Sequence, residues 1–225
     1  MRRIIALNGS PRRNGNTTLL LHELLSGAGE AGAHTEEIVT EALNVKYCRG
    51  CLRCNLLRRC AVRGDDWNDL CSKILMADTV VFASPVYFYH VSASLKKVLE
   101  RFRSFMHVRI TGAGLEHTPW QNWSKTFVVL LCQGSPDEAD ARHIRELFTF
   151  ITESLGPGNR LHTIIGTGLA VPGQVAMPLA ALRALYGRMN LPGSAAESDY
   201  ARNQKLMRRC FRLGHALGGN RNSDS

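Results

Sequence analysis

The stretch that most constrains the fold is IIALNGSPRRNGNTT, residues 4–18. Residues 4–7 form a short apolar run, which is typical of a strand buried on both faces of a parallel sheet. Asn8-Gly9 is a turn signal, and the apolar spacing of the following LLLHELL predicts a helix. A helix N-terminus offers unpaired N–H groups, to which hydroxyl and amide side chains and Arg12 and Arg13 can add. We therefore interpret this stretch as a phosphate-binding loop.

Two better-known phosphate loops do not match the stretch. The motif G-x-x-x-x-G-K-[ST] needs four residues between its glycines, whereas five separate Gly9 from Gly15, and no lysine follows. The fingerprint G-x-G-x-x-G is also missing. The pattern suits a single phosphate held by hydroxyls and amides without magnesium. The alternative is an ordinary polar turn between a strand and a helix.

Strand and helix signals alternate along the remainder of the chain. Apolar or β-branched runs predict further strands at 34–41, 79–83, 126–132 and 161–170. Helices are predicted at 16–31, from Asp65 or Asp66 to 77, and at 92–105, 137–155, 173–189 and 199–217. Residues 106–124, with Trp120 and Trp123, look like an irregular excursion. Five alternating units favour a doubly wound, three-layer α/β/α sandwich.

Three loops should converge at one edge of this sheet, because ligands of such folds bind beyond the carboxyl ends of the strands. They are 9–18, 84–90 and 132–137. The second, SPVYFYH, carries Tyr87, Phe88 and Tyr89 after the rigid Pro85. A phosphate loop beside an aromatic loop suggests a planar heteroaromatic ligand with a phosphate tail. The alternatives are that the aromatics cap the core or meet a partner subunit.

Composition and charge limit the classes of partner. The 225 residues are 44% hydrophobic and 21% charged, which is typical of one larger globular domain. The net charge of +9 suits nucleic acid, an anionic cofactor or an acidic protein, but the arginines are scattered and not interleaved with aromatics, so we expect no nucleic-acid binding. No apolar run approaches the roughly 18 residues of a membrane span, so we expect no membrane association. A strand signal at the start leaves no room for a signal peptide, and we expect a cytoplasmic protein.

Three motifs carry a family resemblance. NGSPRRNGNT, the SPVYF loop before a helix with Leu95-Lys96, and GTGLAVPGQV resemble the NADPH-dependent FMN reductase and multimeric flavodoxin group, from residue 1 to about 190. The resemblance implies a flavodoxin-like fold with a five-stranded parallel sheet of order 2-1-3-4-5, FMN as cofactor, and a homodimer or homotetramer. We accordingly divide the chain into an FMN-binding domain, 1–190, and a C-terminal basic helix with a disordered tail, 191–225.

The resemblance also implies site residues by position. Those that would hold the FMN phosphate are Ser10, Arg12, Asn16, Thr17 and Thr18. Those that would border the isoalloxazine ring are Pro85, Val86, Tyr87 and Phe88, with Gln133, Gly134 and Ser135 on its other side. The chain departs from the family in having Glu100-Arg101 where Asp-Arg is frequent, and Cys132-Gln133-Gly134-Ser135 where a Gly- or Thr-rich turn is frequent. No catalytic side chain is expected, because the flavin carries the chemistry.

Four of the seven cysteines lie within thirteen residues, as C-x2-C-x2-C-x5-C: Cys48, Cys51, Cys54 and Cys60. This clustering favours metal or redox chemistry over disulfides. Zinc could use the same ligands, although structural zinc sites more often have two separated C-x-x-C pairs, and unmetallated thiols are a third interpretation. The spacing favours an iron–sulfur centre. The stretch is similar to the compact motif of the iron–sulfur flavoproteins, which implies a 4Fe–4S cluster.

The remaining cysteines and histidines carry no firm signal. Cys71 is interpreted as a core thiol, and Cys132 and Cys210 are given no role. His90 lies near the predicted site, where packing is its simplest role. The arginines around the cysteines would offset a cluster's charge and attract an acidic, ferredoxin-type electron donor. They are Arg49, Arg53, Arg58, Arg59 and Arg63.

These observations lead to one functional hypothesis and two alternatives. The hypothesis is an FMN-dependent oxidoreductase, an iron–sulfur flavoprotein that passes electrons through a 4Fe–4S cluster and FMN to oxygen, peroxide or a quinone. The first alternative is a cluster-free FMN or quinone reductase with NAD(P)H as its donor. The second is a non-catalytic electron carrier of the flavodoxin type, against which the positive charge and the length both count.

Overall fold

The centre of the computed structural model, which describes residues 1–219, is a five-stranded parallel sheet in the order β2-β1-β3-β6-β7. Its strands are β1 (Arg3–Asn8), β2 (His34–Val39), β3 (Thr79–Pro85), β6 (Thr126–Cys132) and β7 (Arg160–Gly166). Numbered among themselves, these strands have the order 2-1-3-4-5. The predicted flavodoxin-like sandwich is therefore confirmed.

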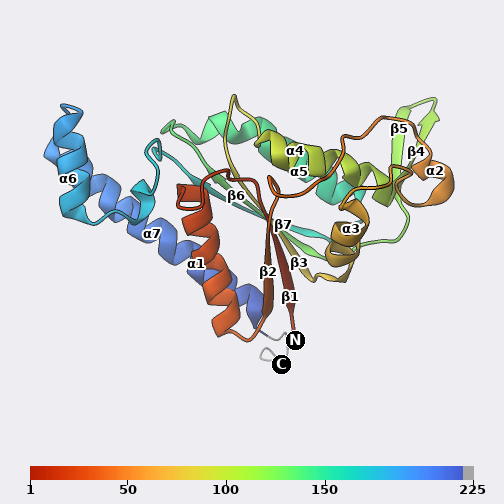
Figure 1. The fold of residues 1–225 in the computed structure, drawn as a ribbon, viewed down its shortest axis with the longest axis horizontal. Helices are drawn as coiled ribbons and strands as arrows, with labels where there is room; N and C mark the ends of the chain where they lie inside the picture. Colours follow the sequence, from red (N-terminus) through yellow and green to blue (C-terminus); the bar gives the residue numbers. More distant parts are fainter. Residues whose placement is uncertain (220–225) are drawn as a thin grey trace.

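Helices cover both faces of the sheet (Figure 1). One face carries α1 (Asn16–Glu30) and α7 (Gly193–Gly218). The other carries α3 (Trp67–Met76), α4 (Ala93–Arg101) and α5 (Arg142–Ser154). The strand β6 shows why its sequence is apolar throughout: Phe127, Val129 and Leu131 enter one core, and Val128, Leu130 and Cys132 enter the other. Alternate residues of a strand point to opposite faces, and here both faces are covered.

Glycines allow α1 and α7 to approach closely. A Cβ added at Gly214 would lie 1.8 Å from the carbonyl oxygen of Leu24, and one at Gly27 would lie 2.1 Å from that of Phe211. Leu206, Met207 and Leu213 of α7 pack against the core of this face. The C-terminal helix thus packs chiefly against α1, while its first turns form a small separate cluster with α6 (Leu179–Arg188).

Several predicted boundaries differ from the structure. Residues 106–119 form an antiparallel hairpin, β4 (Met106–Thr111) and β5 (Gly114–Pro119), where we predicted an irregular excursion. Pro178 interrupts the predicted helix 173–189, so that α6 begins at Leu179. The helix α7 begins at Gly193, directly after Pro192 and earlier than predicted. The part of the predicted tail beyond residue 219 lies outside the described residues.

The hairpin and a short helix, α2 (Cys54–Leu57), lie together at one end of the molecule, and α6 with the start of α7 lies at the other (Figure 1). Trp123 is buried in the molecule's own aromatic core, 4.8 Å from Phe105 between ring centroids. It therefore contributes to the core and offers no surface to a partner. Within residues 1–219, no helix combines the length and the apolar character that a membrane span requires.

Candidate functional site

The phosphate loop ends at an uncapped helix. Gly15 is the N-cap residue of α1, no side chain accepts a hydrogen bond there, and the first turn holds no acidic residue. The N–H groups of a helix's first turn have no intrahelical partner and carry the positive end of the helix dipole. Arg12 and Arg13 are exposed beside them. This end of α1 therefore has the donors and the charge that an anion requires.

Hydroxyl groups fix the shape of this loop. The Ser10 and Thr18 hydroxyls both donate to the carbonyl oxygen of Arg12, at 3.2 and 3.0 Å. The Asn8 side chain donates to the Thr18 Oγ1 at 3.1 Å and accepts from the Ser10 N–H at 2.9 Å. These contacts hold the loop in a compact form over the carboxyl end of β1.

Two of the predicted phosphate-binding side chains make contacts within the protein. The Asn16 amide donates to the carbonyl oxygens of Leu169 and Val171, at 3.1 and 2.9 Å, and accepts from the N–H of Val175 at 3.0 Å. Thr17 is buried beside Cys132, and its side chain offsets part of the effect of burial on the pKa of that thiol. A phosphate could therefore bind to the backbone N–H groups of these two residues, which lie at the start of α1.

The motif GTGLAVPGQV is the segment to which Asn16 is bonded. The Gln174 side chain secures the same segment, since its Nε2 donates to the Gly168 carbonyl at 2.9 Å and its Oε1 accepts from the N–H of Val171 at 3.1 Å. Asn203 of α7 donates to the Gln174 carbonyl at 3.2 Å. The motif thus connects the start of α1 to the C-terminal helix.

The aromatic loop contains a tight turn with unusual dihedral angles. The backbones of Tyr87 and His90 exchange two hydrogen bonds, of 2.8 and 2.9 Å. Between them Phe88 and Tyr89 have φ angles of 49° and 61°. Two successive positive φ angles define a type I′ turn, which normally uses Asn or Gly, so bulky aromatics here are strained. The Phe88 side chain is 100% exposed. The strained backbone keeps the Phe88 ring exposed, where a ligand or a partner could contact it.

The third loop meets the other two at the same edge of the sheet. The N–H of Val86 donates to the Cys132 carbonyl at 2.8 Å, and the N–H of Gly9 donates to the Ala83 carbonyl at 2.7 Å. Gln133 is buried, and its Nε2 donates to the Asp137 carbonyl at 2.6 Å. Its Oε1 is buried without a partner within the described residues. The expected convergence of the three loops is confirmed.

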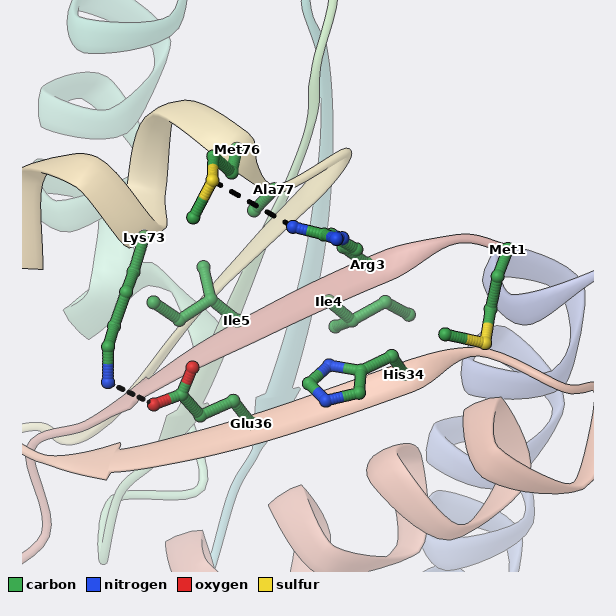
Figure 2. A pocket seen from close by; sticks show the side chains of 9 residues that line it. All are labelled: Met1, Arg3, Ile4, Ile5, His34, Glu36, Lys73, Met76 and Ala77. Atoms are coloured by element: carbon green, nitrogen blue, oxygen red, sulfur yellow. Dashed lines mark hydrogen bonds and ion pairs between the residues drawn. The ribbon is translucent and has the colours of Figure 1, made fainter.

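The surface near the phosphate loop is hollowed toward β2. This cavity is lined by Ser10, Arg13 and Thr18 of the loop and its helix, and by Glu37 and Glu41 from and after β2. A different depression lies at the other end of β1 and β2, near their first residues, where Lys73 pairs with Glu36 at 2.5 Å and Arg3 Nη1 donates to the Met76 sulfur at 3.8 Å (Figure 2). It contains none of the predicted site residues.

The four clustered cysteines line one common cavity of about 190 Å³. Cys51 is exposed, Cys48 and Cys60 are half-buried, and Cys54 is buried at the start of α2. Burial raises the pKa of Cys54, and the charge of Arg103 offsets part of that effect. Within residues 1–219, no three His, Cys, Asp or Glu side chains converge closely enough to hold a single metal ion. The cysteines therefore share a cavity without forming a compact ligand set.

The β4–β5 hairpin supports this cysteine loop, and the sequence did not predict it. The Asn55 amide donates to the Val108 carbonyl at 2.8 Å and accepts from its N–H at 3.1 Å. Arg103 donates to Asn55 Oδ1 at 2.9 Å and contacts Cys54 Sγ at 3.5 Å. Arg103, from the 3₁₀ helix η1 (Phe102–Phe105), and Val108 of β4 thus fix α2 in place.

Arg101 is a site residue that the sequence analysis named only as part of Glu100-Arg101. It lines the cysteine cavity, its side chain is 0% exposed, and it pairs with the buried Asp65 at 2.5 Å. Burial alone would raise the pKa of Asp65, but its hydrogen bond to Arg101 and those from backbone N–H groups lower that pKa overall. In the sequence, Arg101 is recognisable only as an arginine at the end of an amphipathic helix. Its burial, which the fold decides, distinguishes it from the other arginines.

Comparison with known proteins identifies the family. The family model for NADPH-dependent FMN reductase matches residues 2–151, about two thirds of the chain. The chain belongs to this family. An iron–sulfur flavoprotein of Methanocaldococcus jannaschii is 40% identical over 101 residues, which cover 45% of this chain and 52% of the relative. One of Archaeoglobus fulgidus is 31% identical over 103 residues, 46% of each chain. The matches thus span about half the length of these curated relatives.

Solved structures of similar fold cover nearly the whole chain. An NAD(P)H:quinone oxidoreductase from Methanothermobacter marburgensis has a TM-score of 0.63 at 16% identity and covers 98% of this chain and 99% of its own. An FMN-dependent NADH-azoreductase from Bacillus anthracis, solved with FMN, has a TM-score of 0.65 at 12% identity and covers 97% and 100%. At these identities the likeness shows a common fold.

Proposed function

We propose that this member of the FMN reductase family is an FMN-dependent oxidoreductase. The observation that carries the proposal is the meeting of an uncapped, arginine-flanked α1 N-terminus with a strained aromatic turn at one edge of the sheet. An anion site beside an exposed aromatic ring suits a planar cofactor with a phosphate tail. When bound, FMN supplies the redox chemistry, and the protein supplies binding and orientation.

The chain's own residues divide that work. The N–H groups of the first turn of α1 and the charges of Arg12 and Arg13 would hold the phosphate, while Ser10 and Thr18 keep the loop in shape. The 85–88 segment would border one side of the ring. Gln133 would accept a hydrogen bond through its unpartnered Oε1. Burial and the nearby Lys96 lower the pKa of His90, whose Nδ1 accepts a hydrogen bond from the Val91 N–H at 2.9 Å.

We further propose that the cysteine cavity holds a 4Fe–4S cluster. The fit rests on four free thiols and three arginines around one cavity, a donor set suited to an anionic iron–sulfur centre. A cube-shaped cluster also spaces its thiolates farther apart than one metal ion does. The names of the curated relatives support this choice. The cluster would supply one-electron chemistry and is proposed to be held by Cys48, Cys51, Cys54 and Cys60.

The proposed donor is an acidic, ferredoxin-type protein, which the exposed arginines near the cysteines would attract. The proposed acceptor is small: oxygen, peroxide or a quinone. We also propose a homodimer or homotetramer, in which a second subunit would cover exposed Phe88 and Tyr89.

An absorption spectrum with iron and sulfide analysis, on protein purified without oxygen, tests this function. We expect a flavin spectrum with a broad shoulder near 400 nm and about four irons per chain. FMN titration of the apo-protein should give saturable binding that Arg12→Glu weakens at least tenfold. Absence of saturable FMN binding would contradict the oxidoreductase itself.

The second candidate is a cluster-free, NAD(P)H-dependent FMN or quinone reductase, favoured by the family match and by the fold shared with the quinone oxidoreductase. Bound flavin that NADPH bleaches rapidly without oxygen, in protein that holds no iron after anaerobic reconstitution, would favour it. Absence of any oxidase, peroxidase or reductase activity in the holo-protein would instead favour the non-catalytic carrier.

A further inference from the structure

We infer that Arg101 places a buried positive charge and free N–H donors against the cysteine cavity, so as to stabilise the reduced form of an iron–sulfur cluster there. The inference rests on the proposed function, because it concerns the group that this cavity is proposed to hold. It assigns to Arg101 a role distinct from that of the exposed arginines of the cysteine loop.

The Arg101 guanidinium is fixed by contacts with Asp65, Lys46 and Trp67, none of which lines the cysteine cavity. Its Nη1 donates to Asp65 Oδ2 at 2.5 Å and to the Lys46 carbonyl at 2.8 Å, and the guanidinium carbon lies 5.1 Å from the ring centroid of Trp67. Both charged side chains are buried, at 0% and 1% exposure. Asp65 does not line the cysteine cavity, whereas Arg101 does. The pair therefore presents its positive end to the cysteines.

The remaining donors of Arg101 are unused. Its Nε and Nη2 are buried and have no hydrogen-bond partner within residues 1–219. An unmet buried donor destabilises the fold, and more so when it is charged, so native proteins seldom leave one without a partner. A cluster with four thiolates carries negative charge and sulfur acceptors, which are the partners that these N–H groups lack.

The expected consequence is a higher reduction potential. Reduction adds negative charge to the cluster, and both nearby positive charge and hydrogen bonds to the sulfurs raise its potential. The charge of Arg101 acts in a buried, low-dielectric site. Arg49 lines the same cavity but is exposed, so water and salt screen its charge. Arg49 is therefore the matched control.

The test is the cluster's midpoint potential, measured by anaerobic titration of the reconstituted full chain. D65N/R101M removes both buried charges together. We expect it to lower the midpoint by at least a tenfold change in the one-electron equilibrium, about 59 mV. D65N alone leaves the Arg101 charge less offset, so the midpoint should rise. R49M should change the equilibrium less than threefold. Circular dichroism and iron content verify that each variant is folded and loaded.

A merely structural role of Arg101 would not shift the midpoint potential in opposite directions in D65N and D65N/R101M. An unchanged midpoint in the double variant, or shifts of the same sign in both, would overturn the inference. R101K keeps the ion pair and serves if the neutral variants do not fold: its loss of the free guanidinium donors should lower the midpoint, and an unchanged midpoint would contradict the inference. Wild-type protein without iron after reconstitution would overturn the cluster proposal as well.

Discussion

Gly9 is the residue at which the phosphate loop touches the rest of the site. A Cβ there would lie 2.6 Å from Ser92 Oγ, 2.9 Å from Leu95 Cβ and 3.2 Å from the Ala83 carbonyl oxygen. The loop can therefore rest on the start of α4 and the end of β3 only if residue 9 has no side chain.

Gly9→Ala should consequently destabilise the protein by about 1–3 kcal/mol, because the methyl group overpacks a buried contact. It should also weaken FMN binding, since the loop must move. Urea unfolding and FMN titration measure the two effects. Gly112→Ala is the control, because nothing lies within 4 Å of its added Cβ. Equal stability of the two variants would show that the loop adjusts freely.

Asp65 links stability to acid pH. Its pKa in the folded protein is lowered, on balance, from the ordinary value of 3.8, since the contacts with Arg101 outweigh burial. A lowered folded pKa contributes stability that is complete above the unfolded pKa and is lost as the pH falls through the folded value. The free energy of unfolding should therefore fall more steeply in wild type than in Asp65→Asn as the pH drops below about 4. Unfolding curves across that range measure the slopes, and equal slopes would refute the linkage.

At the scale of elements, the contact of α1 with α7 depends on glycine. Gly214 and Gly218 of α7 would place Cβ atoms 1.8 and 2.4 Å from carbonyl oxygens of Leu24 and Ala28 in α1. Backbone atoms cannot move aside as a flexible side chain can, so the two helices must separate if either glycine gains a methyl group.

Gly214→Ala should cost about 3 kcal/mol or more, which exceeds the usual penalty of one added methyl group in a core. Gly29→Ala is the matched control in the same helix pair: it meets nothing within 4 Å, and alanine favours the helix by about 0.5–1 kcal/mol. Thermal unfolding should move the two midpoints in opposite directions. A Gly214→Ala variant as stable as wild type would mean that α7 does not pack this closely.

For the whole molecule, the seven cysteines form two chemical groups. Burial raises the pKa of both Cys132 and Cys210 to about 12, and that of Cys71 to about 11. The role of Cys71 as a core thiol agrees with its packing against the main core. Cys132 and Cys210 belong to the core beneath α1 and α7. Thiols in this state are unreactive, since the thiolate is the nucleophile.

Iodoacetamide should therefore label the apo-protein selectively. Cys51 should react first, because it is exposed, and Cys132 and Cys210 should react only in denaturant. Mass spectrometry of tryptic peptides over time distinguishes the sites. Labelling of Cys132 at the rate of Cys51 would show that the core opens readily. Bound iron should slow labelling at the four clustered positions and leave the other three unchanged.

The amino-acid sequence by itself determined the order of strands and helices, the loop that starts α1 and the cysteine spacing. These signals are local: an apolar run such as 79–83 or 126–132 is buried on both faces in any such sheet, and Gly, Pro and Asn mark its ends. The hairpin at 106–119 escaped prediction, because its polar strands pack on α2 and not on the main sheet.

Tertiary structure decided which side chains meet. Asn16 and Thr17 read as phosphate ligands in sequence, and the fold also bonds the Asn16 amide to the carbonyl oxygen of Val171 and buries Thr17. The sequence does not distinguish Arg101 from the other arginines. The fold buries its side chain against Asp65, leaves two of its nitrogens without a partner within residues 1–219, and makes the residue part of the lining of the cysteine cavity. Burial and partner choice depend on long-range packing. The residues that surround a side chain, not its neighbours along the chain, set its charge and its hydrogen bonds.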